Sequence, residues 1–88
     1  MRTAFRKSFA RDLKKVKNRD LLDRVREKIE EVERVTSLLE VQGVKKLSGA
    51  EEYYRIRLGR YRIGIALEGE EVEFIRFLHR RDIYRYFP

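Results

Sequence analysis

The sequence predicts an α+β fold: an N-terminal strand, a two-helix antiparallel hairpin, and then a three-stranded antiparallel meander. Apolar residues recur at steps of three and four in the first half of the chain, which is typical of helices. In the second half they recur at steps of two, which is typical of strands. Because 88 residues suit one domain, we expect residues 1–88 to fold as a single unit.

The first half of the chain contains a short strand and two helices. Residues 2–6 are expected to be extended, and Ser8 is expected to cap the helix that follows. That helix has one apolar stripe, formed by Phe9, Leu13 and Val16, and Asn18 breaks the pattern. The second helix should start near Asp20, with its stripe formed by Leu22, Val25, Ile29 and Val32. Both stripes need an apolar partner, so both helices should cover the same face of a sheet.

The second half predicts three strands after an irregular stretch at residues 36–52, in which Leu47 is a candidate core anchor. The strands are expected at residues 53–58, 61–67 and 71–78. The last of them is apolar on both faces, as in a central strand covered on both sides. The first strand should pair with one of these three, and the C-terminal segment RRDIYRYFP should form one helical turn or a tail.

The predicted hairpin has two chemically different faces, since side chains alternate along a strand. One face collects Tyr54, Ile56, Leu58, Tyr61, Ile63 and Ile65. The other carries Arg55, Arg57 and Arg62, with the small residues Gly64 and Ala66 as a shallow floor between long basic side chains. On the third strand, Val72, Phe74, Arg76 and Leu78 alternate with Glu73, Ile75, Phe77 and His79, and the pattern leaves open which set faces the helices.

The charge and composition narrow the functional classes. The net charge of +7 favours a polyanionic partner, either nucleic acid or an acidic protein. The chain has no cysteine, no carboxylate pair and no metal-ligand cluster, so no metal or other cofactor is expected. The charged N-terminus does not resemble a secretory signal and no run is long enough to span a membrane, so a cytoplasmic protein is expected.

The arginines of the hairpin are candidate phosphate ligands. Cations that face each other across a sheet destabilise it by up to roughly 1 kcal/mol per pair, so a retained cluster suggests a use. Guanidinium groups bind phosphate in bidentate fashion and stay charged at all accessible pH. The alternative is a solvent-facing surface in which arginine serves only solubility.

The C-terminal stretch LHRRDIYRYF contains the only histidine, His79, which we expect close to the basic face. Beside Arg80 and Arg81, its charged form should be disfavoured. Tyr84 and Tyr86 could stack on bases, or the aromatic residues could pack the tail against the sheet. For Phe87 we favour the packing role.

The segments KKLSG at 45–49, YYRIRLGRYRIGI at 53–65 and LHRRDIYRYF at 78–87, behind an amphipathic helix pair, resemble the RelE/ParE toxin superfamily. The resemblance covers nearly the whole chain and is strongest to archaeal RelE-type toxins. It implies the toxin of a type II toxin–antitoxin system, which is a ribosome-dependent endoribonuclease. Such toxins cut mRNA in the ribosomal A site by attack of the 2′-hydroxyl on the adjacent phosphate, which inhibits translation.

The resemblance assigns roles by position. The basic hairpin residues of the family match Arg55 and Arg57, and its arginine at the start of the second hairpin strand matches Arg62. Its arginine after the last strand matches Arg80, with Arg81 as the alternative register, and its C-terminal tyrosine matches Tyr84. RNA or ribosome contacts are expected from Lys45, Lys46, Arg60 and Arg81.

One departure affects the mechanism. Relatives often carry lysine where this chain has Arg55 and Arg57, and arginine cannot act as a base. The base would then be His79 or Tyr84, while Arg62 and Arg80 would stabilise the phosphorane.

Two other functions stay open. The chain could be a ParE-like inhibitor of DNA gyrase without nuclease activity, or a binding module or inactive relative. For both toxin classes the resemblance implies a cognate antitoxin that is acidic or amphipathic.

Overall fold

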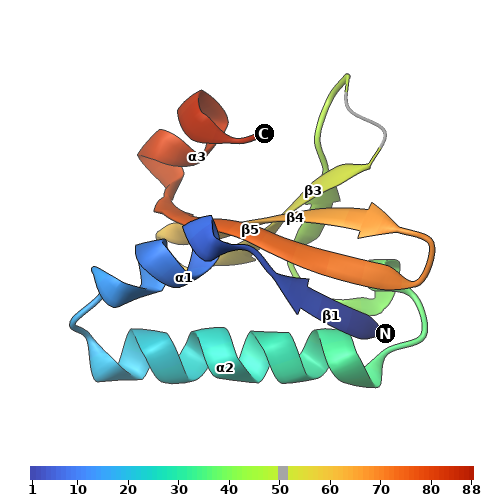
Figure 1. The fold of residues 1–88 in the computed structure, drawn as a ribbon, viewed down its shortest axis with the longest axis horizontal. Helices are drawn as coiled ribbons and strands as arrows, with labels where there is room; N and C mark the ends of the chain where they lie inside the picture. Colours follow the sequence, from blue (N-terminus) through green and yellow to red (C-terminus); the bar gives the residue numbers. More distant parts are fainter. Residues whose placement is uncertain (50–51) are drawn as a thin grey trace.

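Within the part of the chain that the structure describes, the strands join in one five-stranded sheet of order β1-β5-β4-β3-β2, which confirms the α+β class (Figure 1). The structure is a computed structural model that describes residues 1–49 and 52–88. The strands are β1 (Arg2–Phe5), β2 (Val44–Lys46), β3 (Tyr53–Leu58), β4 (Tyr61–Glu68) and β5 (Glu71–His79). The helices are α1 (Lys7–Lys14), α2 (Arg19–Arg34), a 3₁₀ turn η1 (Leu38–Glu40) and α3 (Arg80–Tyr86). No helix in the described ranges has the length and apolar character that crossing a membrane requires.

Strand β1 pairs with β5 in parallel, and every other pairing is antiparallel. The prediction that the first strand pairs with one of the last three strands is therefore confirmed. Strand β5 has a neighbour on each edge, while β4 occupies the middle of the sheet. The predicted meander is present as β3, β4 and β5, but it forms only part of the sheet.

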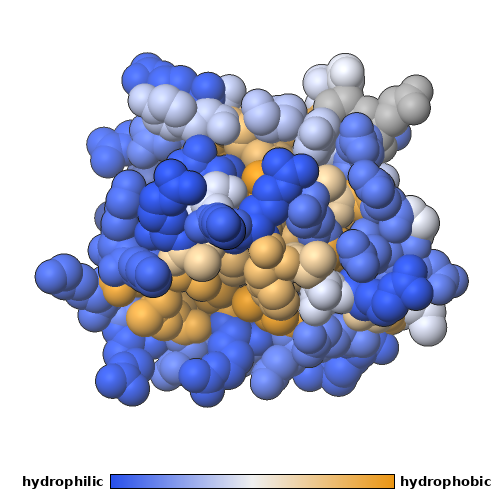
Figure 2. Space-filling model, in the orientation of Figure 1, coloured by the Kyte–Doolittle hydropathy of each residue, from blue (hydrophilic) through white to orange (hydrophobic). Residues whose placement is uncertain are grey.

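Helices α1 and α2 run in opposite directions and lie on the same side of the sheet (Figure 1). Their buried residues share one core with β3, β4 and β5, formed by residues such as Phe9, Val25, Val32, Ile56, Ile63, Ile65 and Phe74. Asn18, expected to interrupt the helical pattern, starts α2, because its side chain accepts the Leu21 N–H at 3.1 Å. Figure 2 shows an apolar band above α2, where the helix stripe meets the rest of the molecule.

The expectation that Ser8 caps α1 is wrong. Arg6 holds the N-cap position without a side-chain hydrogen bond, and Ser8 lies within the helix. The Ser8 hydroxyl instead donates to the Ile75 carbonyl at 2.6 Å. Ile75 lies just beyond the last β5 residue that pairs with β1, and it has no partner in β4 because the register shifts between Gly64 and Ile65.

That β-bulge also changes the alternation predicted for β5. Phe74 and Phe77 both lie in the helix-side core, although they are three residues apart, while Ile75 and Leu78 belong to the opposite face. The bulge therefore reverses which residues face the helices beyond Ile75. The Phe77 N–H donates to the buried carboxylate of Asp12 at 2.9 Å, so α1 satisfies backbone groups of β5 beyond the last residue that pairs with β1.

The opposite face of the sheet holds a second, smaller core built by the C-terminal segment. Its buried residues are Ala66, Ile75, Ile83 and Phe87. Of the two predicted alternatives, the C-terminal segment is helical: α3 runs for seven residues and packs on the sheet face away from α1 and α2 (Figure 1). Phe87 packs the tail against the sheet, as predicted.

The stretch 36–52 is more ordered than predicted. It contains η1 and the edge strand β2, and only residues 50 and 51 of it lie outside the described ranges. Strand β2 has three residues, which is too short for a period-two pattern to be recognised in the sequence. Leu47 packs against the smaller core, which agrees with its predicted role as an anchor.

Candidate nucleic-acid interface

The register of the β3–β4 hairpin brings the predicted arginines together. Arg57 is paired with Arg62, and Arg55 is paired with Gly64. Paired residues lie on the same face of a sheet, so all three guanidinium groups share the face that carries α3. The prediction that Arg62 lies near Arg55 and Arg57 is correct. We call Arg55, Arg57, Arg62 and Arg80, together with Tyr84, the arginine cluster.

Arg55 ties three parts of the chain together. Its Nη1 donates to the Gly43 carbonyl at 2.6 Å, and its Nε donates to the Tyr84 hydroxyl oxygen at 3.4 Å. The loop before β2 and helix α3 thus hold this partly buried side chain from two sides. The sequence did not indicate that Gly43 contacts Arg55, because a residue of any type can supply a backbone carbonyl as a hydrogen-bond acceptor.

Arg62 lies within electrostatic range of every other cation in the cluster. Its Nη1 donates to the Gly59 carbonyl at 2.9 Å and to the Tyr61 carbonyl at 2.8 Å, which folds the side chain back over the turn. Burial lowers the pKa of Arg62, and the cations of Arg55, Arg57 and Arg80 lower it further, while Tyr84 partly offsets them. The site therefore concentrates positive charge that an anion would relieve.

Helix α3 brings Arg80 to the cluster. The Arg80 N–H donates to the Arg60 carbonyl at 2.8 Å, which fixes the start of α3 beside the β3–β4 turn. Arg80 is among the groups that lower the pKa of Arg62. Arg80 therefore lies within electrostatic range of Arg62, and Arg60 and Arg81 are exposed.

The expectation that His79 lies close to the basic face is wrong. His79 is paired with Tyr61, whose ring belongs to the helix-side core, and the two rings meet edge to face at 5.5 Å. Its Nδ1 accepts the Arg81 N–H at 3.2 Å and so caps α3. Loss of solvent contact lowers the pKa of His79, as do the cations of Arg81 and Arg80. The lowered pKa agrees with the prediction that the charged form is disfavoured, but the imidazole faces away from Arg55, Arg57 and Arg62.

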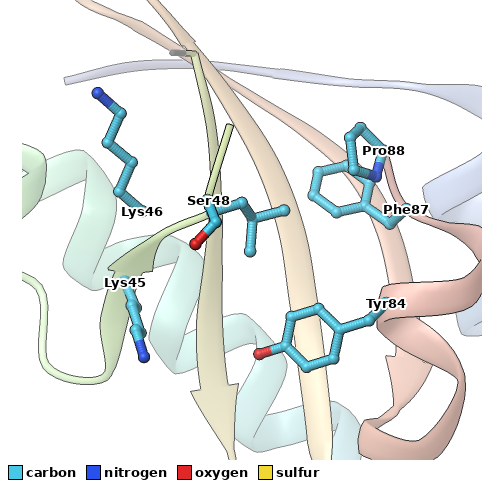
Figure 3. A pocket seen from close by; sticks show the side chains of 7 residues that line it. Lys45, Lys46, Ser48, Tyr84, Phe87 and Pro88 are labelled. Carbon is cyan, nitrogen blue, oxygen red and sulfur yellow. The ribbon is translucent and has the colours of Figure 1, made fainter. Parts of the chain in front are cut away.

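The shallow floor predicted at Gly64 and Ala66 is not open. A side chain at Gly64 would meet the Phe87 ring at 2.8 Å, and Ala66 belongs to the smaller core. The hollow lies instead between β2 and α3, where a cavity of about 370 Å³ is lined by Lys45, Lys46, Leu47, Ser48, Tyr84, Phe87 and Pro88 (Figure 3). The Tyr84 side chain is 61% exposed and borders this hollow.

The two lysines of β2 leave the strand in different directions (Figure 3). Lys45 is paired with Arg55 and so lies on the face of the arginine cluster. Lys46 is paired with Tyr54, whose ring packs on the helix-side core. Of the two predicted RNA contacts, the structure brings Lys45 to the cluster and directs Lys46 away from it.

Comparisons with known proteins agree with this architecture. A family model described as the ParE toxin of the type II toxin–antitoxin system parDE matches residues 4–84. This chain belongs to the RelE/ParE family of toxins. The toxin is 44% identical over 89 residues to toxin RelE3 of Methanocaldococcus jannaschii, and the match covers the whole of both chains.

Two solved structures extend the comparison. The toxin is similar to a RelB–RelE antitoxin–toxin complex from Methanococcus jannaschii with a TM-score of 0.81 and 44% identity, over 97% of this chain and 99% of the other. It also matches an archaeal RelE–RelB complex from Pyrococcus horikoshii with a TM-score of 0.73 and 23% identity, over 90% and 93% of the chains. The second likeness shows the fold alone.

Proposed function

We propose that this toxin is a ribosome-dependent endoribonuclease that cleaves mRNA in the ribosomal A site and so inhibits translation. The 2′-oxygen of the RNA attacks the adjacent phosphorus, and the bond from phosphorus to the 5′-oxygen breaks. The products are a 2′,3′-cyclic phosphate and a free 5′-hydroxyl. One proton leaves the 2′-hydroxyl and one is delivered to the 5′-oxygen, so the reaction needs no oxidant and no water.

The observation that carries this proposal is the convergence of the arginine cluster on one face of the sheet. Arg57 and Arg62 are paired across the hairpin, and Arg55 and Arg80 both act on the Arg62 pKa. The reaction places extra negative charge on the phosphate oxygens in the transition state. Preorganised cations aimed at such charge are the largest single contribution to many enzymatic rate enhancements. Arg62 and Arg80 are the proposed phosphorane ligands.

Tyr84 is the proposed base for the 2′-hydroxyl. The arginines stay protonated and cannot accept a proton. His79, the other sequence candidate, faces the helices, while Tyr84 lies within hydrogen-bond reach of Arg55. Tyr84 would accept this proton as its phenolate, and the Arg55 guanidinium would stabilise the phenolate before the transfer. The exposed ring also offers a surface on which a base can stack.

The surrounding cations are proposed to contact RNA without taking part in the reaction. Lys45 lies on the face of the cluster, and Arg60 and Arg81 are exposed. Lys46 points away from the cluster, so it would contact a separate stretch of RNA. Such contacts position the backbone and supply most of the affinity of a basic protein for RNA.

We further propose that the toxin binds a cognate antitoxin. The two solved relatives described above are complexes of RelE with RelB. An acidic or amphipathic partner could inhibit by neutralising the arginine cluster or by lifting α3, which carries Arg80 and Tyr84. An antitoxin that touches neither feature, and leaves the toxin small enough to enter the ribosome, would contradict this part of the proposal.

The test is mRNA cleavage in a purified translation system. Arg62→Ala should lower the cleavage rate by about 10²- to 10³-fold, the usual effect of losing one preorganised charge donor. Arg34→Ala is the matched control, because it removes an exposed arginine at the end of α2 and should cleave normally. Cleavage that survives Arg62→Ala would place the active site elsewhere.

A second candidate function is inhibition of DNA gyrase. The family model that matches residues 4–84 is described as the ParE toxin, which favours keeping this alternative. Wild-type toxin that leaves mRNA intact on ribosomes but stabilises gyrase–DNA complexes would support it. The arginine cluster would then serve binding alone.

A further inference from the structure

A cavity between α2 and the β3–β4 turn lies next to the arginine cluster, at the edge of β3 beyond its last residue paired with β2. It measures about 560 Å³. Its lining is mostly polar or backbone and consists of Arg24, Lys28, Gln42, Gly43, Arg57, Leu58 and Gly59. Arg57 is shared with the arginine cluster, so the two regions form one continuous basic surface around the turn.

Arg24 packs directly on the hairpin turn. Its Nη1 and Nη2 lie 3.4 and 3.5 Å from the position that a Cβ of residue 59 would occupy, and Gly59 has a positive φ of 59°. The glycine thus serves the turn and also lets the guanidinium approach the backbone. The Gly59 carbonyl accepts the Arg62 Nη1 at 2.9 Å. Two arginines from different elements therefore meet at one turn, Arg24 from α2 and Arg62 from β4.

The charge in this cavity is largely uncompensated. Lys28 is engaged, because its Nζ donates to Glu31 at 2.8 Å and to the Gln42 carbonyl at 3.0 Å. Arg24 and Arg57 are exposed, and within residues 1–49 and 52–88 neither of them forms an ion pair. Lys28 thus lines the cavity with its charge already paired, and the two arginines are available to an anion.

We propose that this cavity binds a backbone phosphate of RNA between Arg24 and Arg57, as an anchoring site outside the reaction centre. The inference rests on the proposed function, since it extends the RNA-binding surface past the hairpin turn onto α2. An acidic protein segment is the less favoured occupant. Leu58 is the one apolar side chain in the lining, and protein interfaces depend on buried apolar or aromatic anchors.

The test is the salt dependence of binding to a short single-stranded RNA oligonucleotide, measured with the full toxin. Arg24→Gln should lower the affinity several-fold and reduce the slope of log K against log salt by about 0.7, the value for one lost phosphate contact on single strands. The matched control is Arg26→Gln, which removes the same charge from an exposed position about 200° further round α2. It should leave the slope unchanged.

Cleavage on ribosomes provides a second readout. Arg24→Gln should raise the ribosome concentration needed for half-maximal cleavage and leave the rate at saturating ribosomes unchanged. Equal salt slopes for Arg24→Gln and Arg26→Gln would overturn the inference, as would an Arg24→Gln defect confined to binding of the antitoxin. The salt dependence of RNA binding is measured without cleavage. If the wild-type toxin does not cleave mRNA, the proposed function is rejected, but the binding measurement still tests this inference.

Discussion

At the scale of single residues, the orientation of His79 depends on the bulge at Ile75. Without the bulge, strict alternation would place His79 on the same face as Ile75, which belongs to the core under α3. The extra residue turns Phe77 and His79 toward the helices instead, so the imidazole pairs with Tyr61. One unpaired residue in β5 therefore turns the histidine away from the face that carries Arg55, Arg57 and Arg62.

His79→Gln tests this placement through the pH dependence of stability. The pKa of His79 is lower in the folded protein than the ordinary value of 6.5, so the folded state binds fewer protons than the unfolded chain below that value. This contribution to stability is complete above pH 6.5 and is lost as the pH falls from there through the folded-state pKa. In the His79→Gln variant, the free energy of unfolding measured with urea should fall less steeply between about pH 7 and pH 5.

His79 is the only histidine, so no other imidazole contributes to this pH range. Cleavage on ribosomes by His79→Gln should stay close to the wild-type rate at neutral pH. A large loss of cleavage in a folded variant would show that His79 acts in the reaction. An unchanged decline of stability with acid would contradict the role of its neutral ring at the start of α3.

At the scale of elements, α3 decides whether the cluster is complete. The helix contributes Arg80 and Tyr84, yet it is held to the sheet mainly by Ile83 and by Phe87, whose ring covers Gly64. Gly64 is needed because the ring approaches the backbone too closely for any side chain. The glycine that the sequence suggested as an open floor is in fact the docking point for the tail.

Gly64→Ala should displace α3. The added Cβ would lie 2.8 Å from the Phe87 ring, so the ring must move and the small core must loosen. We expect a loss of about 1–3 kcal/mol in the free energy of unfolding, as for other overpacked sites, together with a marked loss of mRNA cleavage. Urea unfolding and ribosome cleavage measure the two effects.

A double-mutant cycle with Phe87→Ala separates this clash from other effects of the substitution. If the ring causes the loss, Gly64→Ala should cost much less in the Phe87→Ala background than in the wild type. Equal costs in both backgrounds would mean that Gly64 matters for its backbone alone.

At the scale of the whole molecule, the net charge of +7 is distributed so that one end of the hairpin is strongly basic. Arg55, Arg57, Arg62, Arg80 and Arg24 come from four different elements and gather around one turn. Such a concentration of one sign of charge speeds encounters with oppositely charged partners. Repulsion among these cations also destabilises the folded protein, and a bound anionic ligand would offset that loss.

The rate of association with the proposed antitoxin should therefore fall steeply with ionic strength. Screening shortens the Debye length from about 30 Å at 0.01 M salt to about 8 Å at 0.15 M, which weakens steering over the distances at which the partners approach. The dissociation rate should change much less, since close contacts are screened less. Stopped-flow measurements across this salt range check both rates, and an association rate independent of salt would exclude electrostatic steering.

The sequence by itself determined the fold class, the order of the elements apart from η1 and β2, and the presence of Arg55, Arg57 and Arg62 on one face. These features follow from local periodicity and from a two-residue turn, which are encoded within a few positions. Tertiary structure alone decided the rest. The bulge that turns His79 toward the helices and the Phe87 ring over Gly64 depend on contacts between distant segments. So does Arg24 against Gly59, because a charged residue on the outer face of a helix carries no signal of the turn that it will meet.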